Sequence, residues 1–84
     1  MKYEIRIASS AEREIDKLPT SIHTRIAKKI LSLEYNPRPR VTKKLIGRNE
    51  YRLPVGDYRI LYTIEDKKHV ITAFAVGHRR EVYR

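Results

Sequence analysis

The first residues of the chain alternate between hydrophobic and charged positions. From Lys2 to Ala8, the apolar residues Tyr3, Ile5 and Ile7 are separated by charged ones. A period of two is typical of a β-strand with one face buried. We therefore predict an opening strand that ends at Ser9 or Ser10.

A helical period follows this strand. Ser9 and Glu12 have the spacing of a capping box, which predicts a helix start at Ser9. The apolar positions then recur at intervals of four and three residues, at Ala11, Ile15 and Leu18. The pattern predicts a short amphipathic helix that stops before Pro19.

A second helix is predicted with Thr20 or Ser21 as its cap and Asn36-Pro37 as its end. Its apolar stripe consists of Ile22, Ile26, Ile30 and Leu33, and the cations off that stripe are Arg25, Lys28 and Lys29. The two helices should form a hairpin with one apolar side, which needs a sheet to cover.

Strand signals dominate the second half. Asn36 to Arg40 contains two prolines and cannot continue a helix, and Val41 to Gly47 is expected to be extended or loop-like. Three segments rich in β-branched and aromatic residues follow, separated by Gly56-Asp57 and by a polar turn: Tyr51–Val55, Tyr58–Glu65 and Val70–Val76.

These elements predict an α+β domain of order β-α-α-β-β-β that spans residues 1–84. The expected sheet is mostly antiparallel and four-stranded, with the N-terminal helical hairpin packed on one face. The other face has no second layer of helices. An uncovered face on a basic protein is a natural binding surface.

The turn at Gly56-Asp57 sets the direction of the neighbouring side chains. A two-residue loop pairs Val55 with Tyr58 and Tyr51 with Tyr62, so these residues share the apolar face. Arg52 and Arg59 then lie together on the open face. Two solvated arginines are the ordinary alternative, but guanidinium forks on an uncovered face match phosphate geometry.

Charge narrows the class of partner. The chain has 19 Lys and Arg residues against 10 Asp and Glu, a formal charge of +9. Nucleic acid is the first candidate partner and an anionic protein the second. A membrane is not expected, because no basic amphipathic segment is present and Val70–Val76 is too short to span one. The N-terminus lacks a secretion signal, so we expect a cytoplasmic protein.

The predicted basic tail begins at Gly77 and is expected to fray. It carries His78, Arg79, Arg80 and Tyr83. Together with Lys43 and Lys44 these residues could extend an RNA-binding surface, or they could be solvated charges, with Tyr83 packed on the sheet rim.

The sequence favours metal-free chemistry. Its three histidines, at positions 23, 69 and 78, have no neighbouring carboxylate pairs, so neither a metal nor a cofactor is expected. Glycine-rich phosphate loops and spaced carboxylate pairs are also missing. What remains is attack of an RNA 2′-hydroxyl on its own phosphate, with arginines stabilising the charge. The base would be His78, Tyr83 or the substrate environment.

Two stretches resemble a known family. Residues 51–62, YRLPVGDYRILY, and residues 76–83, VGHRREVY, look like the RelE/ParE superfamily of bacterial and archaeal toxins. The order of elements extends the resemblance over the whole chain. The tail is similar to that of the RelE branch, whose members cut messenger RNA in the ribosomal A site.

The resemblance implies roles for single residues. Arg52 matches a residue that contacts phosphate, and Arg59 matches the arginine that stabilises the transition state. Arg79 matches a residue proposed to protonate the leaving oxygen, and Tyr83 matches a proposed general base or stacking platform. Glu50 departs from the pattern, since a lysine is usual there, as does a shorter tail.

The resemblance also implies partners: an acidic antitoxin that wraps the toxin, the ribosome, and messenger RNA in its A site. The implied function is a ribosome-dependent endoribonuclease toxin of a type II toxin–antitoxin system. Two alternatives stay open, a ParE-like inhibitor of DNA gyrase and a non-catalytic RNA-binding module.

Overall fold

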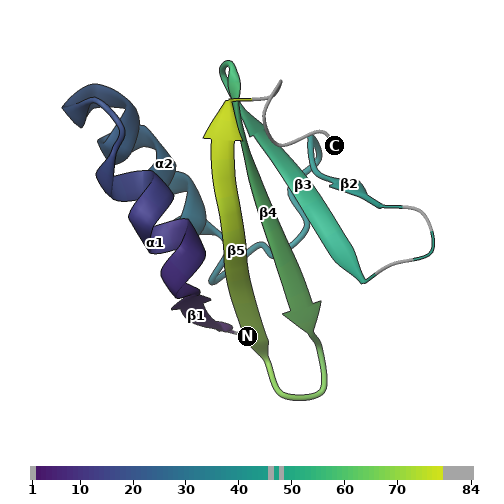
Figure 1. Cartoon of the computed structure of the whole chain (residues 1–84). Helices are drawn as coiled ribbons and strands as arrows, with labels where there is room; N and C mark the ends of the chain where they lie inside the picture. Colours follow the sequence, from purple (N-terminus) through teal and green to yellow (C-terminus); the bar gives the residue numbers. More distant parts are fainter. Residues whose placement is uncertain (1, 46, 48, 79–84) are drawn as a thin grey trace.

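Two helices cover one side of a five-stranded sheet. The structure, a computed structural model, describes residues 2–45, 47 and 49–78. Figure 1 shows both helices on the same side of the long strands. In chain order the elements are β1 (Glu4–Ile7), α1 (Ser9–Asp16), α2 (Thr20–Ser32), β2 (Lys43–Lys44), β3 (Glu50–Val55), β4 (Tyr58–Glu65) and β5 (Val70–His78).

The sheet has the strand order β1-β5-β4-β3-β2. β1 runs parallel to β5, and the other three neighbouring pairs are antiparallel. The predicted α+β class is confirmed, but the predicted four-stranded sheet is wrong by one strand. Within the expected loop, Lys43 and Lys44 pair with Arg52 and Tyr51 and form β2. Two residues are too few to show an alternating pattern.

The predicted serine and threonine helix caps are wrong. Ala8 and Pro19 occupy the N-cap positions of α1 and α2, and neither makes a side-chain capping bond. Ser10 lies inside α1 and its hydroxyl donates to the carbonyl oxygen of Phe74 at 2.8 Å. The hydroxyl therefore ties the helix to β5 rather than capping it.

The core lies between the helices and the inner face of the sheet. The predicted apolar stripes supply the helical side, since Ile15 is 6% exposed and Ile26 is fully buried. Tyr51 and Tyr62 stack with ring centroids 5.7 Å apart on the sheet side. The other large, fully buried side chains are Ile30, Leu33, Leu53, Ile60, Ile64, Ile71 and Val76.

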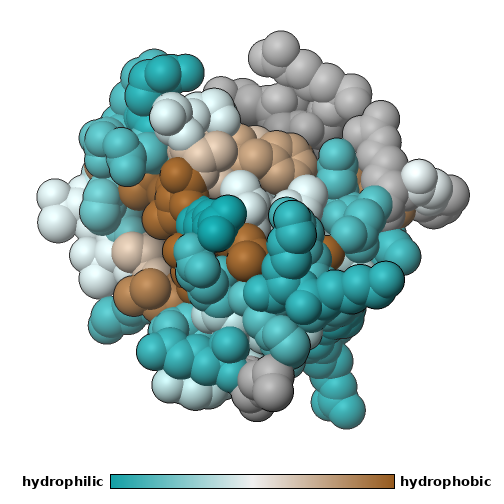
Figure 2. Space-filling model, turned by 90° about the horizontal axis from the view of Figure 1, so that it is seen from below, coloured by the Kyte–Doolittle hydropathy of each residue, from teal (hydrophilic) through white to brown (hydrophobic). Residues whose placement is uncertain are grey.

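The outer surface is mainly hydrophilic. Seen from below, polar side chains surround separate hydrophobic patches (Figure 2). The large apolar residues exposed within the described part of the chain are Ile7, Leu31, Tyr35 and Val41. Ile7, expected on the buried face of its strand, is 42% exposed because it lies at the end of an edge strand.

Arg38 anchors the connector between α2 and β2 to the sheet. Its guanidinium group binds both carboxylate oxygens of Asp66, at 3.3 and 2.8 Å, and donates to the Tyr51 hydroxyl at 3.1 Å. The Tyr3 hydroxyl donates to the same carboxylate at 2.8 Å. These bonds join the connector, the β4–β5 turn and the start of the chain.

A β-bulge changes the direction of side chains near the end of β5. Leu61 pairs with Ala75, but Tyr62 pairs with Ala73, so Phe74 is an extra residue on β5. Residues on opposite sides of a bulge point to opposite faces for the same parity of numbering. Ala73 is buried before the bulge and Val76 is buried after it.

The predicted frayed tail begins too early. Gly77 and His78 belong to β5 and pair with Arg59 and Tyr58. Arg79, Arg80 and Tyr83 lie outside the described residues.

Candidate functional site

The β3–β4 hairpin places Arg52 and Arg59 on the face of the sheet opposite the helices. Val55 pairs with Tyr58, Arg52 with Leu61, and Pro54 with Arg59, which confirms the predicted register. Gly56 makes this register possible, because the tight turn needs its φ of 61°. The buried residues of both strands are Tyr51, Leu53, Val55, Ile60, Tyr62 and Ile64, all on the other face.

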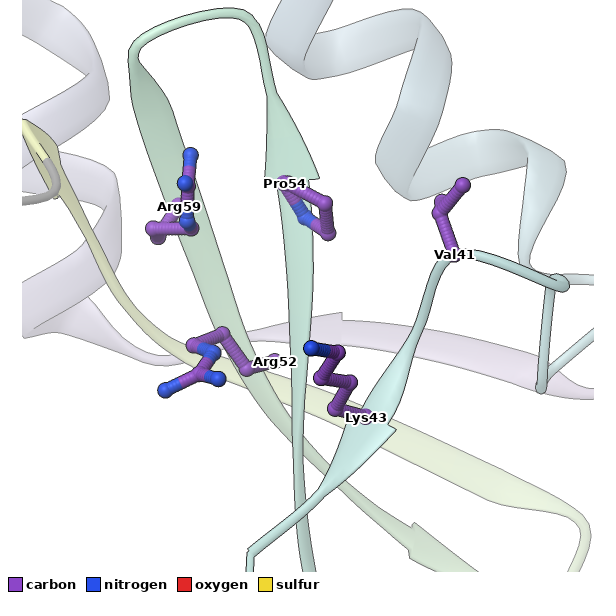
Figure 3. Close-up of a pocket in the computed structure, with 5 residues that line it drawn as sticks. All are labelled: Val41, Lys43, Arg52, Pro54 and Arg59. Atoms are coloured by element: carbon purple, nitrogen blue, oxygen red, sulfur yellow. The ribbon is translucent and has the colours of Figure 1, made fainter.

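Three cations line a hollow on the open face. Its volume is about 100 Å³, and the lining residues are Val41, Lys43, Arg52, Pro54 and Arg59. Figure 3 shows these side chains coming from the segment before β2 and from β2, β3 and β4. Pockets that enclose a small molecule usually exceed ~300 Å³. The hollow therefore suits a phosphate group of a longer chain better than a whole small substrate.

β2 completes this site, although the sequence did not show it as a strand. Lys43 pairs with Arg52, and residues directly opposite in a ladder share a face. Lys44 pairs with Tyr51 and so faces the other way. Of the two lysines predicted to extend the basic surface, the structure brings Lys43 to the arginines and leaves Lys44 apart.

The backbone of the hairpin holds the Arg59 side chain. One guanidinium nitrogen donates to the carbonyl oxygen of Gly56 at 3.1 Å and to that of Tyr58 at 2.8 Å. On β5, the residue opposite Arg59 is Gly77. Arg59 is thus oriented by two carbonyls and has no side chain beside it at this position, which leaves room for a ligand.

His78 lies on the opposite face from Arg52 and Arg59. Its ring meets that of Tyr58 edge to face, with centroids 5.8 Å apart. It lines a hollow beside α1 with Glu14 and Leu18. The bulge at Phe74 sends His78 to this face. The structure therefore does not bring His78 to the arginines, and a role for it as a base there is not carried forward.

The other predicted tail residues lie outside the described part of the chain: Arg79, Arg80 and Tyr83. Within the described part, no group of three His, Asp or Glu side chains is placed to hold a metal ion. Over the same residues, no helix is long and apolar enough to cross a membrane.

Comparison with known proteins agrees with this fold and site. Residues 5–83 match the family model of the ParE toxin of the type II toxin–antitoxin system parDE. This chain belongs to the RelE/ParE superfamily of toxins. The resemblance expected from the two sequence stretches is thereby confirmed.

RelE-type proteins are among the relatives of this superfamily member. It is 31% identical to Toxin RelG of Mycobacterium tuberculosis over all of its own length and 99% of that protein. The toxin in the archaeal RelE–RelB complex from Pyrococcus horikoshii is 30% identical, with a TM-score of 0.84, and covers 94% of this chain and 97% of its own. The toxin of the intact Escherichia coli RelBE complex is 26% identical, with a TM-score of 0.78, over 90% of this chain and 95% of its own.

Proposed function

We propose that this toxin is an endoribonuclease that cuts messenger RNA on the ribosome. The observation that supports the proposal is the joint placement of Lys43, Arg52 and Arg59 around one hollow on the open face. Three cations on an uncovered sheet fit an RNA backbone. The RelE-type relatives raise the prior for the same target, but the cluster carries the argument.

The proposed reaction is an internal displacement at phosphorus. The 2′-hydroxyl oxygen forms a bond to the adjacent phosphorus, and the bond from phosphorus to the 5′ oxygen of the next nucleotide breaks. The products are a 2′,3′-cyclic phosphate and a 5′-hydroxyl end. Arg59 and Arg52 stabilise the extra negative charge on the phosphoryl oxygens in the transition state.

Two proton transfers balance the reaction. A base takes the proton of the 2′-hydroxyl, and an acid gives one to the leaving 5′ oxygen. The resemblance assigns these tasks to Tyr83 and Arg79, which stay predictions because they lie outside the described residues. Tyr83→Phe tests the first task, since loss of cleavage favours a hydroxyl role and near-normal cleavage favours stacking alone.

We further propose that an acidic antitoxin inhibits the toxin by covering its cations. RelE toxins occur bound to RelB in the complexes from Pyrococcus horikoshii and Escherichia coli. The charge of +9 on this chain favours an acidic partner independently. A disordered acidic segment that folds on the open face would block access of RNA to Arg52 and Arg59.

Inhibition of DNA gyrase is the second candidate, and the match to the ParE family model favours it. A protein that only binds gyrase needs no cluster of cations suited to phosphoryl transfer. The two candidates predict different cellular effects, which are broken messenger RNA for one and impaired supercoiling for the other.

The test is to add the toxin to a translating extract and map new messenger RNA 5′ ends by primer extension. We expect cuts at codons in the ribosomal A site, and their loss with Arg59→Ala. Arg40→Ala is the matched control, because Arg40 is exposed and does not line the hollow. Growth arrest with intact messenger RNA and reduced supercoiling would contradict the nuclease and support the gyrase candidate.

A further inference from the structure

A second cationic surface lies on α2, in the layer opposite the proposed cleavage site. Thr20–Ser32 contains no Asp or Glu, and its Arg25, Lys28 and Lys29 are all exposed. Positions separated by three and four residues lie on the same face of a helix. No carboxylate of the described residues lies within 4.0 Å of these three cations. Their charge is therefore available to a partner.

This surface is hollowed where α2 meets the sheet. The three cations line a hollow of about 280 Å³ together with Ser32 and Val55. Val55 follows Pro54, which lines the hollow on the open face. Successive residues of a strand point to opposite faces. The two hollows therefore lie against opposite sides of the same short piece of β3.

The hairpin tip connects the two surfaces. The guanidinium group of Arg25 is close to Gly56 on the helical side, where a Cβ on the glycine would lie 3.4 Å from it. On the other side Arg59 donates to the carbonyl oxygen of the same glycine at 3.1 Å. Cations thus flank the tip from both layers, and the basic surface continues around this end of β3.

We propose that Arg25, Lys28 and Lys29 bind RNA phosphates and dock the toxin on its target, while Arg52 and Arg59 act on the cut phosphate. This inference rests on the proposed ribonuclease function. It divides the basic surface into a docking part on α2 and a chemical part on the open face. The docking phosphates belong either to nucleotides that flank the cut or to the RNA of the ribosome.

The composition of the α2 surface favours RNA over an acidic protein. Interfaces between proteins depend on buried aromatic and aliphatic anchors. The apolar lining residue of this hollow is Val55, which is only 6% exposed. The exposed large apolar side chains of the described chain, Ile7, Leu31, Tyr35 and Val41, do not line it. Binding to phosphates requires only cations at a suitable spacing.

The test compares two triple variants that lose the same charge. The first carries Arg25→Ala, Lys28→Ala and Lys29→Ala, and the control carries Arg13→Ala, Lys67→Ala and Lys68→Ala on other exposed positions. Affinity for purified vacant ribosomes is measured over a series of salt concentrations. We expect the first variant to bind roughly tenfold more weakly, with a salt slope smaller by about 2 to 3, and the control to change little.

Two RNA probes identify the source of the phosphates. Uncleavable single-stranded RNAs of different lengths, with 2′-methoxy groups, are compared with vacant ribosomes. A loss seen only with ribosomes supports docking on ribosomal RNA, whereas a loss that grows with the length of the single strand supports contacts to flanking nucleotides. Lys28→Arg with Lys29→Arg should retain binding in either case.

Equal binding by the two triple variants would overturn the proposal, because net charge alone would then explain the affinity. Weaker binding of the first variant to polyglutamate but not to either RNA would also overturn it, in favour of a protein interface. These assays need no cleavage. If Arg59→Ala leaves cleavage intact, the proposed chemistry fails while the docking result stands.

Discussion

Arg59 in β4 lies directly opposite Gly77 in β5 on the open face of the sheet. This pairing depends on the bulge at Phe74, which shifts the register after Ala73. Without the extra residue, Gly77 would point toward the helices. The bulge therefore places the residue without a side chain beside the arginine that we assign to the transition state.

Gly77→Val should fill the space beside Arg59 and lower cleavage by about tenfold or more. A directly opposite pair has its Cβ atoms only about 5 Å apart, so the valine would contact the arginine side chain. The matched control is Ala75→Val, which enlarges the residue opposite Leu61 on the same strand. The reaction is followed as single-turnover cleavage of ribosome-bound messenger RNA. Equal effects of the two substitutions would show that free space beside Arg59 is not important.

Tyr62→Phe should destabilise the fold by about 1–3 kcal/mol. The buried hydroxyl of Tyr62 donates to the carbonyl oxygen of Pro37 at 2.7 Å and lies 3.2 Å from the Thr42 hydroxyl. Phenylalanine leaves that carbonyl without its donor. Chemical denaturation measures the loss, and Tyr51→Phe is the control, because its hydroxyl contacts the exposed Arg38. A loss for Tyr51→Phe as large as that for Tyr62→Phe would contradict this explanation.

Asp66 should make the stability sensitive to acid. The hydrogen bonds from Arg38 and then from Tyr3 lower the pKa of its carboxyl below the ordinary value. A lowered folded-state pKa adds stability that is present above about pH 4 and is lost as the pH falls through and below that value. The free energy of unfolding of the wild type should therefore exceed that of Asp66→Asn by a constant amount from pH 8 to about 5. The excess should shrink at lower pH.

Arg38→Gln provides the control for this pH dependence. The substitution removes the cation that contributes most to the lowered pKa, so most of the acid-dependent stability should disappear with it. Urea unfolding at a series of pH values measures both variants. An excess stability that stays constant down to pH 2 would show that the carboxyl has no lowered pKa in the folded state.

The sequence predicted the parts of the fold that depend on local patterns. The apolar positions of α1 and α2 and the Gly56-Asp57 turn were sufficient to identify the core face. That turn also placed Arg52 and Arg59 on the open face, because a two-residue loop determines the pairing of both strands. These predictions succeeded because each rests on residues close together in the chain.

The remaining features depend on tertiary contacts. β2 exists only because Lys43 and Lys44 pair with β3, and Ser10 bonds to Phe74 rather than capping its own helix. The bulge at Phe74 was missed for the same reason. Its trace in the sequence is the change from buried Ala73 to buried Val76, which breaks the period of two. That break would have placed His78 on the helical face.

The central claim is that the open face promotes attack of an RNA 2′-hydroxyl on its own phosphate. The most direct measurement uses ribosomes programmed with a messenger that carries a single 2′-deoxynucleotide on the 5′ side of the mapped cut. We predict that the unmodified messenger gives a 2′,3′-cyclic phosphate end and that the deoxy messenger stays intact at this position. Cleavage of the deoxy messenger at the same rate would contradict the account, because its attacking oxygen is missing.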